Sequence, residues 1–214
     1  MVTYTKERIE LVTQDKAKIV GSYYSAEGDK GVILLHQYRL SKDSFDKYAK
    51  ELQKRGYPVL ALDFRGHGES YGTVEGLTER DFSLMIEDVN SASDFLNNKE
   101  KEVLAVIGAS IGANNAFRFS SVRRIPAVLL SPGLNYHEID IKDITCSSPI
   151  FIIASKGDEY SANSSRNLYE NNLFGPKKMI IVPGSSAHGV YMLDENPKLF
   201  EEIINFLKKM EEKD

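Results

Sequence analysis

Residues 103–116, VLAVIGASIGANNA, decide the fold. Residues 103–107 form an apolar run that is too short for a buried helix and ends at Gly108. Such a run predicts a strand buried on both faces of a parallel sheet. Residues 108–112, GASIG, follow, and residues 113–119 are compatible with a helix. Strand, G-x-S-x-G and helix in this order are typical of a nucleophile elbow, in which the hydroxyl of Ser110 is exposed on a strained turn.

Strands and helices alternate on both sides of this stretch. Residues 9–12 and 18–24 predict an antiparallel hairpin, and Gly21 inside the second run indicates a bulge. Further strands are expected at 31–35, 57–62, 125–130, 149–154 and 178–182. Helices are expected between 45 and 56, at 82–96, at 113–119, at 163–173 and at 196–209. A capping box of Thr78 and Asp81 precedes the second of these helices.

Parallel strands need crossover connections, and the helices between these strands supply them. The pattern therefore predicts an α/β fold, a mostly parallel sheet of about eight strands with helices on both faces. The connection at residues 132–148 is a loop of 17 residues, which leaves no room for a large cap domain. No linker, repeat or low-complexity stretch interrupts the chain, so we expect one domain over residues 1–214.

The composition excludes several classes of protein. The chain is 42% hydrophobic with a formal net charge of −4 and no block of Lys or Arg, which argues against a nucleic-acid partner. The chain contains no run of 18 apolar residues, so no membrane span is predicted. The first ten residues are charged and lack an apolar segment, so no signal peptide is predicted. The single cysteine, Cys146, is interpreted as structural and is consistent with the reducing cytoplasm.

Polar residues at the carboxyl ends of the strands are the candidates for a site, because ligands of open α/β sheets bind there. A serine nucleophile needs a histidine base that is oriented by a carboxylate. His188 is the only histidine that follows both the elbow and the last predicted strand, and small residues flank it. His36 and His67 precede the elbow, and His137 is expected on the surface of the long loop.

Asp158 is the predicted acid, since it lies between nucleophile and base and follows the strand at 149–154; the adjacent Glu159 is the alternative. An oxyanion hole needs backbone donors. Ile111 N–H, at the start of the helix, is one candidate. Tyr38 N–H, in the loop after the strand ending at Leu35, is the second, with Gln37 N–H as its alternative.

No cluster of His, Cys, Asp or Glu has metal-ligand spacing, and no glycine-rich phosphate loop opens a helix. We therefore expect neither a metal nor a nucleotide cofactor.

The chain resembles the α/β-hydrolase superfamily, especially its small, lidless esterases and its members similar to dienelactone hydrolase. The resemblance covers nearly the whole chain and rests on LLHQ (34–37), LALDFRGHGES (60–70), GASIG (108–112), GDEYS (157–161) and SAHG (186–189). It implies Ser110 as nucleophile, Asp158 as acid and His188 as base. Two features depart from the family pattern: His36-Gln37 replaces the usual His-Gly, and dienelactone hydrolases have cysteine where this chain has Ser110.

These observations predict hydrolysis of small-molecule carboxylic esters with short to medium acyl chains through an acyl-Ser110 intermediate. Thioesters and small amides are alternative substrates of the same triad, and a binding protein without catalysis is the alternative class. The oligomeric state is left open. Seven residues are candidates for the rim of the site: Tyr38, Arg39, Leu134, Tyr136, Tyr160, Val190 and Tyr191.

Overall fold

A computed structural model describes residues 5–172 and 175–212 of the chain. The chain divides into two compact units, Met1–Val103 and Leu104–Asp214. The expectation of a single domain stays a prediction.

The described strands of the first unit pair in the order β1-β2-β4-β3. They are β1 (Lys6–Val12), β2 (Lys18–Tyr24), β3 (Lys30–Leu35) and β4 (Val59–Leu62). β2 pairs antiparallel with β1 and β4, whereas β3 and β4 are parallel, with Val32 opposite Val59. The parallel pair follows from the connection, because the 3₁₀ helix η1 (Lys42–Phe45) and helix α1 (Asp46–Lys54) cross between the two strands.

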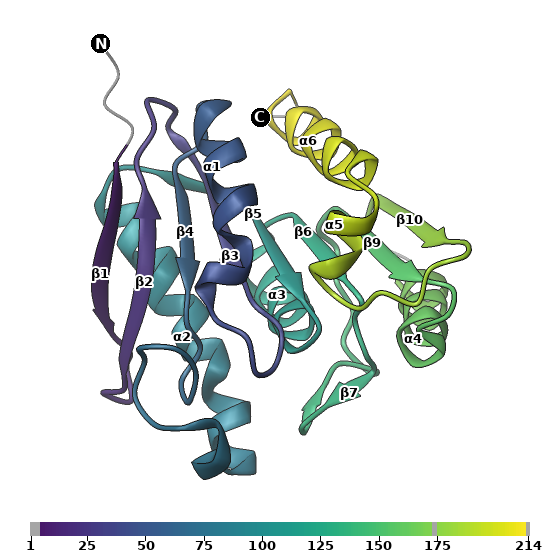
Figure 1. The fold of residues 1–214 in the computed structure, drawn as a ribbon, viewed down its shortest axis with the longest axis horizontal. Helices are drawn as coiled ribbons and strands as arrows, with labels where there is room; N and C mark the ends of the chain where they lie inside the picture. The colour runs from purple at the N-terminus through teal and green to yellow at the C-terminus, as the bar shows by residue number, and fades with distance from the viewer. Residues whose placement is uncertain (1–4, 173–174, 213–214) are drawn as a thin grey trace. The chain divides into compact units, whose positions relative to one another are not determined.

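Helices cover both faces of this four-stranded part of the sheet, with α1 on one face and α2 (Glu79–Asn98) on the other (Figure 1). The predicted capping box begins α2: Thr78 Oγ1 accepts from Asp81 N–H, and the Asp81 carboxylate accepts from Thr78 N–H. A short 3₁₀ helix, η2 (Val74–Gly76), precedes it.

The predicted bulge at Gly21 is wrong. The register of β1 and β2 runs without interruption, with Gly21 opposite Ile9. The glycine has a different role: a Cβ at this position would lie 2.9 Å from the Leu60 side chain and 3.2 Å from the Ala61 carbonyl oxygen, so a larger residue would crowd the neighbouring strand. Gly21 thus marks a close approach of neighbouring strands rather than an extra residue.

The segment Asp63–Ser70, which carries much of the family resemblance, is held by a buried polar network. The Asp63 carboxylate accepts from Lys42 N–H, Lys42 Nζ and Glu69 N–H at 2.7–3.0 Å. Arg65 donates from Nε and Nη2 to Asp88 Oδ1, and its backbone N–H donates to Asp88 Oδ2. Asp88 lies on α2 and is fully buried. The charged residues of this motif therefore fix a loop to its neighbours inside the first unit.

The second unit begins within β5 (Glu102–Ala109), and its described strands pair in the order β5-β6-β9-β10. The other three strands are β6 (Ala127–Leu130), β9 (Ile150–Ser155) and β10 (Lys177–Val182). All three pairings are parallel, with Val106 opposite Ala127 and Leu130 opposite Ile153. Every residue of β6 and β9 is buried, as expected of strands covered on both faces.

Helices α3 (Ile111–Arg123) and α4 (Glu159–Asn171) lie on one face of these strands, and α6 (Lys198–Glu211) lies on the other (Figure 1). The ring of Phe206 on α6 packs on Phe151 of β9 at a centroid distance of 5.7 Å. The expected α/β class, a mostly parallel sheet of about eight strands with helices on both faces, is confirmed.

Three details of the second unit differ from the prediction. Helix α4 starts at Glu159 rather than 163, because Asp158 caps it; the predicted last residue, 173, lies outside the described residues. The 132–148 connection contains a short hairpin, β7 (Asn135–Tyr136) and β8 (Ile139–Asp140). A five-residue helix, α5 (Tyr191–Glu195), precedes α6.

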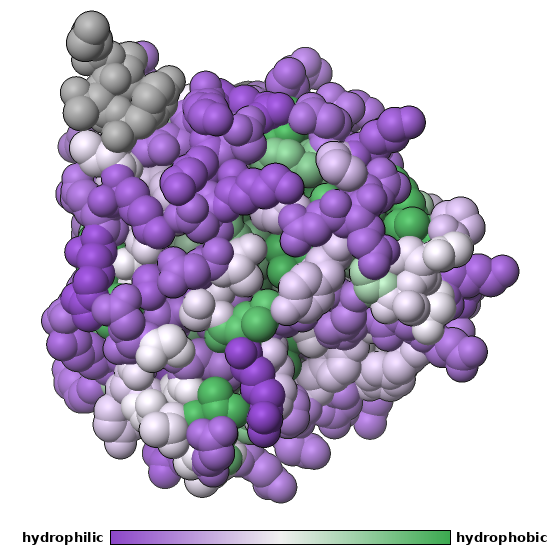
Figure 2. Space-filling model, in the orientation of Figure 1, coloured by the Kyte–Doolittle hydropathy of each residue, from purple (hydrophilic) through white to green (hydrophobic). Residues whose placement is uncertain are grey.

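Hydrophilic residues dominate the face drawn in Figure 2, where hydrophobic residues form only small separate patches. Some large hydrophobic side chains, such as Val12 and Val122, are highly exposed, as is usual for protein surfaces. Among the described helices, none combines the length and the apolar character that crossing a bilayer requires.

Candidate active site

Ser110 lies at the junction of β5 and α3, as the sequence predicts. It is the N-cap of α3 with φ 53° and ψ −115°, a conformation that costs about 1–3 kcal/mol for a residue other than glycine. Its backbone N–H donates to the Leu130 carbonyl of β6 at 2.9 Å, which ties the turn to the neighbouring strand. A Cβ on Gly108 would lie 2.1 Å from the Gly112 carbonyl oxygen, so the strand and helix meet too closely for any side chain there. This is the strand–turn–helix geometry of a nucleophile elbow.

Asp158 follows β9 and serves as the N-cap of α4. Its Oδ1 accepts from the Ser161 N–H at 3.5 Å. Its Oδ2 is 2.6 Å from His188 Nδ1. The side chain of Asp158 is 15% exposed and that of His188 is 34% exposed, so the pair is partly shielded from water. The structure thus brings together the predicted acid and base, whereas the alternative acid, Glu159, is exposed on the first turn of α4.

The loop that carries His188 is fixed by hydrogen bonds to strand ends. Gly189 N–H donates to Ser131 Oγ at 2.9 Å, and Ser131, at the end of β6, is fully buried with φ 50°. Gly157 N–H donates to the Ser185 carbonyl at 2.8 Å. With Nδ1–H donated to the Asp158 carboxylate, the tautomer leaves His188 Nε2 as an acceptor, which is the state a general base needs.

Tyr136, one of the candidate rim residues, lies against the same groups. Its hydroxyl is 2.8 Å from Ser161 Oγ. Its ring meets the ring of His188 edge-on, with centroids 6.1 Å apart and an interplanar angle of 86°. Burial raises the pKa of Tyr136 to about 12, and the nearby Asp158 carboxylate contributes to the rise.

The two predicted oxyanion donors belong to different units. Ile111 is the first residue of α3, directly after Ser110. Tyr38 lies in the first unit, in a turn after β3 that is closed by the bond from Leu40 N–H to the Gln37 carbonyl, with Arg39 at φ 61°. The pairing of Ile111 N–H with Tyr38 N–H or Gln37 N–H stays a prediction.

The sequence was compared with known protein families and with curated proteins. The family described as serine aminopeptidase, S33 (Hydrolase_4), matches residues 26–155, more than half of the chain. The chain belongs to this α/β-hydrolase family. The match includes Ser110 and ends before Asp158 and His188.

Among curated proteins, the α/β hydrolase described here is 29% identical over 146 residues to a monoacylglycerol lipase of Mycolicibacterium smegmatis, covering 64% of this chain and 51% of that protein. It is 27% identical over 126 residues to a putative non-heme chloroperoxidase of Synechocystis, covering 56% of this chain and 44% of that protein. The chain therefore spans about half the length of these relatives.

Solved structures of other proteins share this fold over nearly the whole length of the chain. The esterase Pf2001 of Pyrococcus furiosus superposes with a TM-score of 0.80 at 24% identity, covering 96% of this chain and 90% of that one. A dienelactone hydrolase of Anabaena variabilis superposes with a TM-score of 0.73 at 17% identity, covering 98% and 97%.

The remaining histidines of this α/β hydrolase have other surroundings. His137 is exposed in the turn of the β7–β8 hairpin, as predicted. His36 is fully buried in the first unit, where its Nε2 accepts from Phe64 N–H at 3.0 Å and its Nδ1 lies 2.8 Å from the Gln37 carbonyl oxygen. Burial, and to a lesser extent the neighbouring His67, lower the pKa of His36 to about 4. Cys146 is buried beside Ser120 Oγ at 3.3 Å, in agreement with a structural role.

Sequence reasoning missed three polar residues near the predicted triad: Ser131, Ser161 and Asn114. Ser161 did carry a signal, because a residue three positions after an N-cap aspartate is the usual donor to it. In the part of the chain that the structure describes, no three His, Cys, Asp or Glu side chains gather as metal ligands would.

Proposed function

We propose that this chain hydrolyses carboxylic esters, with Ser110 as nucleophile, His188 as general base and acid, and Asp158 as the orienting carboxylate. The observation that carries the proposal is the 2.6 Å contact between Asp158 Oδ2 and His188 Nδ1, in the same unit as a serine on a strained helix N-cap. The relatives named as a monoacylglycerol lipase and an esterase support this class of reaction.

In the first half of the reaction, His188 Nε2 accepts the Ser110 hydroxyl proton while Oγ attacks the ester carbonyl carbon. The carbonyl oxygen becomes an oxyanion, for which Ile111 N–H at the start of α3 and Tyr38 or Gln37 N–H are the proposed donors. The imidazolium formed is stabilised by the Asp158 carboxylate and then protonates the departing alcohol. The product of this half is an ester of Ser110.

In the second half, His188 takes a proton from water, which attacks the acyl-Ser110 carbonyl, and returns a proton to Ser110 Oγ as the acid product leaves. Substrates with short to medium acyl chains fit a site whose only insertion between β6 and β9, among the described residues, is the β7–β8 hairpin.

Hydrolysis of a panel of p-nitrophenyl esters from acetate to decanoate, with one thioester and one anilide, tests the proposal. We expect turnover of the shorter esters by the wild type and a loss of at least about 10³-fold in Ser110→Ala. Equal rates for wild type and Ser110→Ala would refute the nucleophile. Binding of the esters without turnover by the wild type would favour a binding protein instead.

A further inference from the structure

Strand β10 has an open edge. Among the described strands it comes last in the sheet order and pairs only with β9. The carbonyls of Pro176 and Val182 accept backbone N–H groups at the two ends of β9. Backbone groups of successive residues point to opposite edges of a strand, so the N–H and C=O groups of three residues point away from β9: Lys177, Met179 and Ile181. A further strand can add to β10 along this edge.

The charged side chains of β10 do not block its open edge. Lys177 Nζ donates to the Tyr169 carbonyl on α4. Lys178 Nζ forms an ion pair with Glu202 on α6. The other four residues of the strand, MIIV (179–182), are apolar and partly buried. By contrast, β1, the edge strand of the first unit, is charged at four of its seven positions, which is the usual protection of an edge against pairing.

Helix α6 runs beside β10 (Figure 1). A groove of about 410 Å³ is lined by Lys178 of β10 and by residues of α6, among them Glu202, Asn205, Lys208 and Lys209. The open edge of β10 and this side of α6 therefore belong to one surface, which we call the β10–α6 surface.

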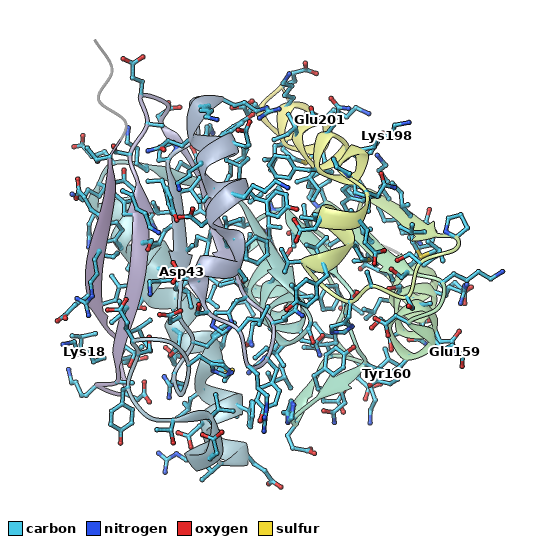
Figure 3. All side chains as sticks on the ribbon, viewed as in Figure 1. Lys18, Asp43, Glu159, Tyr160, Lys198 and Glu201 are labelled. Atoms are coloured by element: carbon cyan, nitrogen blue, oxygen red, sulfur yellow. The ribbon has the colours of Figure 1, made fainter. Side chains whose placement is uncertain are left out.

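The polar stripe of α6 has a charge order that is complementary to its own reverse. At helical spacing the stripe contains Lys198, Glu201, Glu202, Asn205, Lys208, Lys209 and Glu212. Asn205 is the midpoint, and each charge before it is matched by the opposite charge at the same distance after it. Figure 3 labels Lys198 and Glu201 on the outer side of the helix. A lysine at the start and a glutamate at the end oppose the helix dipole, so the dipole does not explain this order.

The midpoints of the strand edge and of the stripe lie close together. The ring of Phe206, which follows Asn205, packs on the ring of Phe151 at 5.7 Å. Phe151 is opposite Lys178 in the register of β9 and β10, and Met179 is the next residue. A single axis can therefore pass near both Met179 and Asn205.

We propose that a second copy of this chain docks on the β10–α6 surface through a two-fold axis. β10 pairs antiparallel with β10 of the second copy, centred on Met179, and extends the parallel sheet of the second unit across the axis. α6 packs antiparallel on α6 of the second copy, centred on Asn205. Glu202 then faces Lys208, and Glu201 faces Lys209, each pair occurring twice.

The stripe favours a second copy over a different partner. A two-fold interface requires a surface that is complementary to itself, because residue i of one copy contacts residue j of the other and the reverse. A uniformly acidic or basic partner would meet like charges on half of the stripe. The reversed stripe of a second copy instead meets opposite charges at every charged position.

Sedimentation velocity of the full chain from about 1 to 100 µM tests the proposal, since the dimer fraction depends on concentration. The wild type should sediment as a dimer at the upper end of this range. Lys209→Glu faces Glu201 with a like charge at two places, and it should raise the dimer dissociation constant by about 10–100-fold. The exchanged variant Glu201→Lys/Lys209→Glu should restore the constant to within about threefold of the wild type. Lys142→Glu makes the same charge change at an exposed lysine after β8 and should leave the constant unchanged.

A wild type that stays monomeric at the highest concentration overturns the proposal. A dimer that Lys209→Glu does not weaken, or that the exchanged variant does not restore, overturns it as well. So does an equal weakening by Lys142→Glu, because net charge alone would then explain the effect.

Hydrogen–deuterium exchange tests whether β10 itself pairs. The outward N–H groups of Lys177, Met179 and Ile181 gain partners in the proposed dimer, so their exchange should slow as the concentration of the wild type rises. In Lys209→Glu at the same concentration, exchange at these amides should stay fast. A dimer that forms without slower exchange there uses another surface and overturns the proposal.

Discussion

Asp158→Asn separates the two roles that the structure gives this residue. Oδ2 accepts from His188 Nδ1–H at 2.6 Å, while Oδ1 caps α4 through Ser161 N–H at 3.5 Å. Asparagine is as good an N-cap as aspartate, so its carbonyl oxygen can keep the cap. Its amide then turns an NH₂ group toward His188 Nδ1, which favours the tautomer with the proton on Nε2 and blocks the base.

The expected magnitude follows from the charge that is lost. A carboxylate about 4 Å from the centre of an imidazolium charge contributes about 4 kcal/mol at an effective dielectric constant near 20, suited to a partly exposed pair. That energy is about 10³-fold in rate, and the wrong tautomer increases the loss toward about 10⁴-fold. The free energy of unfolding should change by less than about 0.5 kcal/mol, because the cap and the packing remain.

The assay is kcat for p-nitrophenyl acetate from initial rates, together with thermal unfolding by circular dichroism. Glu159→Gln is the matched control, since Glu159 is the next residue and is exposed; it should stay within about threefold of the wild type. A value of kcat for Asp158→Asn within threefold of the wild type would refute the assignment of Asp158. So would an equal loss in Glu159→Gln, which would point to the neighbouring carboxylate.

Three further predictions concern stability. His36 has a folded-state pKa of about 4 against about 6.5 unfolded, so the unfolded state takes up the proton first as pH falls, and stability should drop by about 2 kcal/mol between pH 7.5 and 5. Urea titrations should show a smaller drop in His36→Gln, and equal pH dependence in both proteins would contradict this. Gly108→Ala should prevent correct packing of β5 on α3 and abolish fluorophosphonate labelling; normal labelling would show that the elbow tolerates a Cβ. Asp88→Ala should cost about 3–5 kcal/mol in urea denaturation by leaving Arg65 buried with one partner fewer, and a cost below 1 kcal/mol would show that the pair is dispensable.

The elbow and the acid–base pair could be predicted because their signals are local. Gly108 and Ser110 are spaced as a tight turn requires, and the apolar run before them fixes the strand. Asp158 and His188 each follow a strand, and parallel strands bring their carboxyl ends to one edge. Because Asp158 follows β9 and His188 follows the neighbouring parallel strand β10, the topology of the sheet explains the 2.6 Å contact between them.

The β7–β8 hairpin, which carries Tyr136, could not be predicted, because its turn residues are not typical of such turns. Turns of this kind favour Asn-Gly, whereas this chain has His137 and Glu138 with positive φ. Hydrogen bonds from α3 to Ile139 and from α4 to Asn135 hold the two strands that flank the turn, and such contacts depend on the tertiary structure. For the same reason, Tyr136 could be placed only among the candidates for the rim.

The start of α4 was predicted four residues too late although the sequence contained the signal. Its position after a strand predicts Asp158 as a catalytic acid, and an aspartate at that point is also a good N-cap. The structure shows that the same carboxylate caps the helix and contacts His188.

Intact-mass labelling with a fluorophosphonate tests the central claim most directly, because only an activated serine reacts. The wild type should gain one adduct per chain, peptide mapping should place it on Ser110, and Ser110→Ala should gain none under the same conditions. An unlabelled, folded wild type, or an adduct that persists in Ser110→Ala, would contradict the assignment of Ser110 as the nucleophile.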